Sequence, residues 1–228
     1  MLDFINKIAL ISFLAAVPFL FYGFGTETLR VISKFSFGDS RLLAFLAGAV
    51  IFFPCLALAR RFFHSAWCYL ETLEHELTHL LIGLLFLKIP VGIRVSAHAG
   101  GEVRQIGRGT TGQIWITLAP YFFPTVSLAV LIFARFVDLN ALVLLGVLGW
   151  TTAFHLISNW GETSFRQPDL QKAGILKTIL ILPVMNLICY GAVLAFVVGG
   201  GKGFGNFWLE GIAGTFRIIA DVWRMLTS

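Results

Sequence analysis

Residues 75–79 read His-Glu-Leu-Thr-His, which is the H-E-x-x-H pattern. On an α-helix the side chains at positions i and i+4 point the same way, so His75 and His79 can bind one metal ion. Glu76 lies about 100° further round the helix, from where its carboxylate can reach a water molecule in an open coordination position. This set of residues is typical of a zinc site that activates water, with Glu76 as the general base.

A third protein ligand has to come from elsewhere in the chain, because a zinc hydrolase uses three protein ligands and leaves the fourth position to water. The candidates are His155 and Glu162, near the end of an apolar stretch, and Asp169, in the polar segment that follows. From the residues alone these alternatives stay open. Four other side chains of ligand type have the positions of ordinary boundary or loop residues: His64, His98, Asp138 and Asp221.

The apolar stretch that contains the motif, Ala66 to Leu87, is interrupted by five ionisable side chains: Glu71, Glu74, His75, Glu76 and His79. Such groups are destabilising in a bilayer unless they face a partner or a metal ion. Glu71 lies one turn before His75 and can accept the second ring N–H of that histidine, but a carboxylate that faces the membrane boundary or a water-filled lumen explains Glu71 equally well. A polar stripe that only seals a helix bundle would need more hydrogen-bonding partners than the other apolar stretches offer.

The composition is that of a membrane protein. Of the 228 residues 57% are hydrophobic and 13% are charged, and the mean hydropathy is +0.85. No segment is polar enough to form a separate water-soluble domain, which excludes a soluble enzyme with a membrane anchor. The net charge of +5 is spread between apolar runs, so we expect no nucleic-acid partner. The three cysteines lie in apolar runs and lack the C-x-x-C spacing of a metal or redox pair.

Five uncharged stretches reach the roughly 20 residues that a helix needs to cross a bilayer. They lie between Lys7 and Glu27, Arg41 and Arg60, Arg108 and Arg135, Asp138 and Glu162, and Lys177 and Lys202. With Ala66 to Leu87 as a sixth, the sequence predicts an all-α polytopic membrane protein of about six transmembrane helices. Both termini then lie on one side, and the distribution of Lys and Arg favours termini outside and residues 88–107 in the cytoplasm.

Residues 88–107 predict a β-hairpin or short sheet at the membrane face. They contain Pro90, β-branched residues in partial alternation, and the pair Gly100-Gly101. An exposed strand edge here can hold an extended substrate by β-augmentation, and a hairpin that merely covers the site is an equally good explanation.

These features resemble the site-2 protease family of intramembrane zinc metalloproteases. The resemblance covers about residues 66–175: an H-E-x-x-H in an apolar helix, a membrane-facing hairpin with Gly-Gly, a span that opens Leu-Ala-Pro, and an Asn followed by an Asp. It implies that Asp169 is the third zinc ligand and that Asn159 lies near the site, with Gly100 and Gly101 near the site or the substrate. The chain has Gln-Pro-Asp-Leu where the family has Leu-Asp-Gly, and its Asn is further from the Asp.

The function that the resemblance implies is hydrolysis of a peptide bond in or next to a transmembrane segment, with Zn²⁺ as cofactor and a membrane protein or peptide as substrate. The competing interpretation is a non-catalytic membrane subunit whose zincin-like core binds a partner helix. Intact Glu76 favours the enzyme, because a purely structural zinc site has no use for a general base. A zinc hydrolase of lipids or small amides is a third interpretation. The expected partners are the lipid bilayer and, since no soluble sensing domain fits in the connections, a separate membrane subunit.

The chain divides into three parts on this basis. Residues 1–65 form two N-terminal transmembrane helices, and residues 66–175 form the zinc-protease-like core, in which Pro120 and Pro124 can bend one span. Residues 176–228 form the last transmembrane helix and an interfacial amphipathic helix. The interfacial helix is predicted by apolar side chains at helical spacing: Trp208, Ile212, Phe216, Ile219, Trp223 and Leu226.

Overall fold

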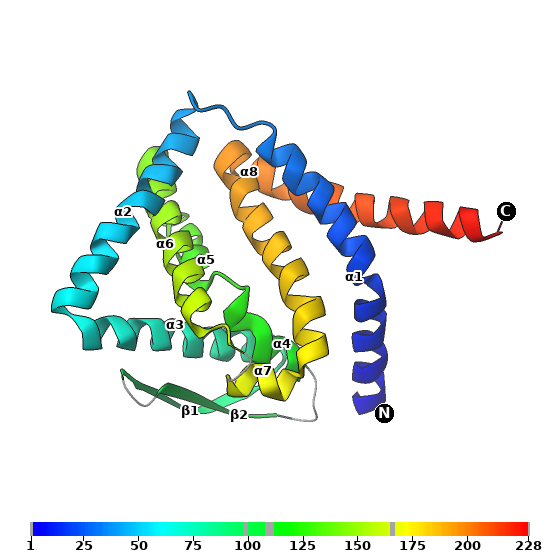
Figure 1. The fold of residues 1–228 in the computed structure, drawn as a ribbon, viewed down its shortest axis with the longest axis horizontal. Helices are drawn as coiled ribbons and strands as arrows, with labels where there is room; N and C mark the ends of the chain where they lie inside the picture. Colours follow the sequence, from blue (N-terminus) through cyan, green and yellow to red (C-terminus); the bar gives the residue numbers. More distant parts are fainter. Residues whose placement is uncertain (1, 98–99, 108–111, 165–166, 228) are drawn as a thin grey trace.

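The computed structural model describes residues 2–97, 100–107, 112–164 and 167–227. It consists of helices and one small hairpin (Figure 1). The elements are α1 (Leu2–Ile32), α2 (Ser40–Phe62), α3 (His64–Leu85), β1 (Ile89–Ser96), β2 (Gly100–Ile106), α4 (Gln113–Leu118), the 3-10 turn η1 (Ala119–Tyr121), α5 (Thr125–Phe133), α6 (Ala141–Glu162), α7 (Pro168–Ala173) and α8 (Ile175–Thr227). The predicted class, a multi-pass helical membrane protein with a hairpin, is confirmed.

Four of the described helices are long and apolar enough to cross a membrane, namely α1, α2, α6 and α8. A fifth crossing is formed if α4, η1 and α5 are counted as one span. The chain bends by 84° between η1 and α5. Pro120 lies in η1 and Pro124 precedes α5 at this bend. Because proline has no N–H to donate to the helix, the two prolines break the span as predicted.

The helix that carries the motif, α3, is not among these crossing helices. It lies across the lower ends of α2 and α6 in Figure 1, beside the hairpin. Its ionisable side chains lower its hydropathy, and several of them are buried against other helices instead of lipid. The estimate of about six spans therefore becomes five at most among the described helices. With five crossings the two termini lie on opposite sides of the membrane, and with four they lie on the same side, so the expectation that both termini share one side stays a prediction.

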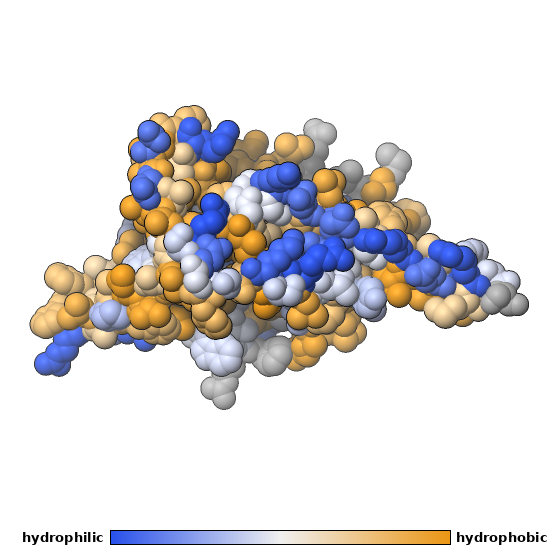
Figure 2. Space-filling view, turned by 90° about the horizontal axis from the view of Figure 1, so that it is seen from above, coloured by the Kyte–Doolittle hydropathy of each residue, from blue (hydrophilic) through white to orange (hydrophobic). Residues whose placement is uncertain are grey.

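The longest helix, α8, has 53 residues and changes direction at Gly200, whose φ of 59° and ψ of −149° are not helical. The part before Gly200 crosses the molecule, and the part after it projects past α1 (Figure 1). Figure 2 shows hydrophilic side chains along one edge of this projecting helix and hydrophobic side chains along the other. Phe216, Trp223 and Leu226 are exposed there, in agreement with the predicted amphipathic segment.

Close packing of α2 on α6 depends on two glycines. A Cβ on Gly48 would lie 1.8 Å from the carbonyl oxygen of Gly146, and one on Gly149 would lie 1.9 Å from that of Phe45. Backbones at this distance are typical of small residues between membrane helices. Phe52, Trp67 and Phe154 then join α2, α3 and α6 in one aromatic cluster, which holds the first half of α3 in place.

The hairpin follows α3 directly, because the helix ends in a tight reversal. Leu87 has a left-handed φ of 57°, the N–H of Leu87 donates to the carbonyl of Leu84, and the N–H of Lys88 donates to that of Gly83. The strands pair antiparallel from Ile89↔Ile106 to Ser96↔Gly100, with a bulge between Pro90 and Gly92. This geometry returns β2 alongside the motif helix.

Candidate metal centre

Three side chains of ligand type converge at the hairpin end of the molecule. One ligand atom each of His75, His79 and Asp169 lies within 4.8 Å of the others. Asp169 Oδ2 is 3.0 Å from His79 Nε2 and 3.5 Å from His75 Nε2. The histidines come from α3 and the aspartate from the first turn of α7. Of the two third-ligand candidates whose side chains the structure describes, His155 and Asp169, it is Asp169 that lies beside the motif histidines.

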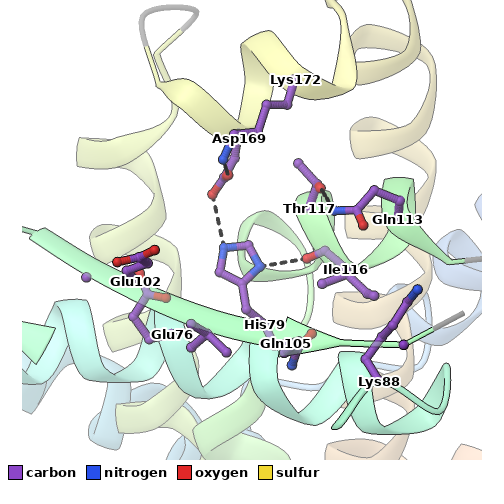
Figure 3. Close-up of a pocket in the computed structure, with 13 residues that line it drawn as sticks. Glu76, His79, Lys88, Glu102, Gln105, Gln113, Ile116, Thr117, Asp169 and Lys172 are labelled. Atoms are coloured by element: carbon purple, nitrogen blue, oxygen red, sulfur yellow. Dashed lines mark hydrogen bonds and ion pairs between the residues drawn. The ribbon is translucent and has the colours of Figure 1, made fainter. Parts of the chain in front are cut away.

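The donor set fits a zinc ion. With Zn–N and Zn–O bonds of roughly 2.0–2.2 Å, neighbouring ligand atoms of a tetrahedral site are about 3.4 Å apart, close to the two distances measured here. His79 Nδ1 lies 2.7 Å from the carbonyl oxygen of Ile116. Because a carbonyl only accepts, Nδ1 carries the proton and donates it, which leaves the Nε2 lone pair for a metal. Figure 3 shows the imidazole held between Ile116 and Asp169.

Asp169 is held in its ionised form. Burial raises the pKa of its carboxyl group, but the hydrogen bonds to His75 and His79 outweigh burial, so the pKa lies well below the usual value. Lys172 adds a positive charge, with Nζ 3.5 Å from Oδ1. An ionised carboxylate is the form that binds a metal.

Glu76 lies beside this group and faces the same cavity. The cavity has a volume of about 370 Å³ and is lined by Glu76, His79 and Asp169 together with residues of β2 and α4. Glu76 is 6% exposed, and its carboxylate packs against Gly101 of β2, where a Cβ would lie 2.3 Å from Glu76 Cγ and 2.5 Å from Oε1. Gly101 therefore leaves the space that Glu76 occupies.

The hairpin is fastened to the motif helix by Gln105. Its amide Nε2 donates to the carbonyls of His79 (3.1 Å) and Leu80 (3.3 Å). Gly83 makes room for this side chain, since a Cβ there would lie 2.1 Å from Gln105 Oε1. The same strand thus carries Gly101 against Glu76 and Gln105 against the backbone of His79, so the position of β2 sets the shape of the cavity.

A methyl group at Gly101 is expected to displace Glu76 without disturbing the metal ligands. Displacements of about 1 Å from productive geometry cost on the order of 10²-fold in rate. We therefore expect Gly101→Ala to lower the peptide hydrolysis that the resemblance implies by one to two orders of magnitude. Gly92→Ala on the other strand is the matched control, because nothing lies within 4 Å of its Cβ position. The measurement is the cleavage rate of a membrane reporter that the wild type cleaves, with zinc content alongside. Equal rates for Gly101→Ala and Gly92→Ala would contradict the assignment.

His155, the first alternative ligand, belongs to a different polar cluster. Its ring is fully buried, and Nδ1 lies 2.8 Å from Glu74 Oε1. Asn159, one turn further along α6, has its side-chain nitrogen 2.9 Å from His155 Nε2. Asn159 thus lies near α3, where it contacts His155. The sequence assigned no role to Glu74, and in the structure its partner is His155. The sequence feature that could have predicted this cluster is an acidic residue next to the motif, together with a His-x-x-x-Asn pair in a span.

The remaining predicted residues are placed as follows. Glu71 accepts a hydrogen bond from Trp67 Nε1 (2.7 Å) and lies 3.6 Å from Arg60, and its contact with the His75 ring stays a prediction. Gly100 has a left-handed φ of 72° at the hairpin turn, with nothing within 4 Å of its Cβ position.

His98 and the side chain of Glu162 lie outside the described residues. Cavity residues that the sequence did not single out are Lys88, Glu102, Val103, Gln105, Gly107, Gln113, Ile116, Thr117 and Lys172.

Comparison with known families gives one match. The family described as Peptidase M50B-like matches residues 42–165, which is more than half of the chain and includes the motif and the hairpin. Asp169 lies just beyond the matched segment. No curated protein and no solved structure matches the chain.

Proposed function

The chain belongs to the Peptidase M50B-like family of site-2 membrane metalloproteases, and on that premise we propose that it hydrolyses a peptide bond in or next to a transmembrane segment, with Glu76 as general base. The observation that carries this proposal is that Glu76, His79 and Asp169 line one shared cavity. His75 completes the group of ligand type.

His75, His79 and Asp169 would hold the zinc ion. When bound there, zinc supplies a Lewis acid for the scissile carbonyl and lowers the pKa of a water molecule. Glu76 takes the proton of that water and later gives it to the leaving amine. Ile116 orients the ring of His79 by accepting from Nδ1, and Gly101 leaves the space in which the Glu76 carboxylate sits.

The open edge of the hairpin is the proposed site for the substrate backbone. Among the described residues the sheet has two strands, so β2 has one edge free of strand pairing. Its residues Gly101, Glu102, Val103 and Gln105 border the cavity. A peptide bond inside a helix is shielded by its own hydrogen bonds. A substrate that adds to the strand edge is held extended, and its carbonyls become accessible to Glu76 and the metal.

Zinc content of the purified protein tests the ligand set. We expect about one zinc per chain in the wild type and almost none in Asp169→Ala after dialysis, because the remaining pair of histidines binds far more weakly than three ligands. Asp221→Ala, an exposed residue on the projecting part of α8, is the matched control. His155→Gln should retain zinc if it is folded, as judged by its unfolding transition. Full zinc occupancy in Asp169→Ala would overturn the assignment, and loss in folded His155→Gln would move the third ligand to His155.

We also propose that the hairpin side is cytoplasmic, because the described basic residues are slightly more numerous at that end of the spans than at the other. Those described at the hairpin end are Lys7, Arg60, Arg61, Lys88, Arg94, Arg104, Lys172 and Lys177. In a variant whose native cysteines are replaced by alanine, an impermeant maleimide applied to intact cells should label Ser36→Cys, in the α1–α2 connection, but not Gly92→Cys. The reverse labelling pattern would place the hairpin outside.

A further inference from the structure

A second cavity lies beside the first, at the same end of the molecule. It has a volume of about 600 Å³ and is bounded by the beginning of α1, by α4, by α7 and by the beginning of α8. Gln113, Thr117 and Lys172 line both cavities. The proposed protease activity makes no use of this second cavity.

One wall of the second cavity is apolar, and the rest carries polar side chains, three of them lysines. Leu10, Phe13 and Trp115 form part of the apolar wall, and the rings of Phe13 and Trp115 meet edge to face with centroids 4.6 Å apart. Lys7 and Lys177 line the cavity together with Lys172, so three different elements each contribute one amine. None of the residues described as lining it is acidic. The cavity therefore matches a ligand with an anionic group and an apolar body.

The position of this cavity indicates where such a ligand comes from. α1 begins next to Lys7 and α8 begins next to Lys177, at the end of the molecule that carries the hairpin (Figure 1). Lysines at the ends of membrane spans lie at the level of the lipid headgroups, and the apolar side chains beyond them lie at the level of the acyl chains. A zwitterionic headgroup would bring an ammonium group toward three amines, whereas an anionic headgroup would not.

We propose that the second cavity binds the headgroup of an anionic phospholipid. The phosphate lies among Lys7, Lys172 and Lys177, and the acyl chain runs along Phe13 and Trp115.

The site is connected to the metal centre through Lys172. Its Nζ lies 3.5 Å from Asp169 Oδ1, and the same side chain lines the second cavity. A phosphate there competes with Asp169 for this ammonium group. The lipid would thus act on the electrostatics of a zinc ligand without touching it, whereas the binding itself is independent of the proposed proteolysis.

The test uses quenching of tryptophan fluorescence by brominated lipids in the full chain, reconstituted in vesicles of phosphatidylcholine. The signal of Trp115 is isolated as the difference between the wild type and Trp115→Phe. We expect brominated phosphatidylglycerol to quench it several-fold more than brominated phosphatidylcholine at the same mole fraction. Equal quenching by the two lipids would overturn the proposal.

Two paired variants test the lysines. Replacing Lys7 and Lys177 together by Gln should lower the apparent association constant for the anionic lipid about 30-fold. Replacing Lys34 and Lys202, which line a cavity at the opposite end together with Glu27, should leave it unchanged. An equal loss in both pairs would mean that only general surface charge attracts the lipid, and no loss in the first pair would exclude the site. Millimolar inorganic phosphate should not relieve the quenching, and relief by it would identify a site for free phosphate instead.

Discussion

Glu76→Gln is expected to abolish peptide hydrolysis while zinc remains bound. A positioned general base contributes about 10²–10⁴-fold to the rate, and glutamine cannot accept and return a proton. Glutamine has the same shape, so it still fills the space beside Gly101. The loss should therefore fall on kcat and leave KM nearly unchanged, as for a group that acts only in the transition state.

The informative comparison is Glu102→Gln, because Glu102 is the other glutamate that lines the cavity. Its side chain is 55% exposed and lies 3.8 Å from Arg104, so water solvates it and it is poorly placed as a base in a shielded site. Single-turnover cleavage and zinc content should be measured for both variants. A larger loss of kcat in Glu102→Gln than in Glu76→Gln would assign the general base to Glu102. Loss of zinc in Glu76→Gln would mean that Glu76 is a ligand.

The spacing of the motif determines much of the site, because positions i and i+4 share a helix face wherever the helix lies. His75 and His79 therefore converge as the sequence predicts. Asp169 is predicted as a ligand only by the family resemblance, because nothing in the sequence around it distinguishes it from other acidic residues that follow an apolar stretch. Imidazole and carboxylate groups serve both as ligands and as ion-pair partners, so residue types alone left His155 and Asp169 as competing candidates.

The orientation of α3 could not be read from hydropathy. Hydropathy counts the charged groups between Ala66 and Leu87 but does not say whether they face lipid, a cavity or other helices. In the structure Glu71 lies near Arg60 of α2, the other four face α6, α7 and the hairpin, and the helix lies across the bundle (Figure 1). The contact of Gly101 with Glu76 could not be predicted from the sequence either. It depends on strand register and on the left-handed turn at Leu87, a residue that rarely adopts this conformation.

The buried hydrogen-bonded pair of Glu74 and His155 is expected to give the largest effect on stability. The two atoms are 2.8 Å apart, and the side chains are 4% and 0% exposed. Removing one partner of a buried pair costs about 3–5 kcal/mol, because the other is left without compensation in a medium of low dielectric constant. Glu74→Ala and His155→Ala should each lower the free energy of unfolding in detergent by this amount. Glu71→Ala is the control on the same helix: it removes an ion pair with half-exposed Arg60 and a hydrogen bond from Trp67, which together should cost about 2 kcal/mol.

The double variant Glu74→Leu/His155→Leu separates the two contributions of this pair. Well-packed apolar residues can replace a buried ion pair with little loss, so the double variant should be more stable than either single variant, with a coupling energy of several kcal/mol. Stability close to the wild type combined with weaker zinc binding would show that the pair orients α3. Glu74 precedes His75 directly, and rotation of α3 moves His75 and His79 relative to Asp169. A cost for Glu74→Ala no larger than that for Glu71→Ala would mean that the pair contributes neither stability nor orientation.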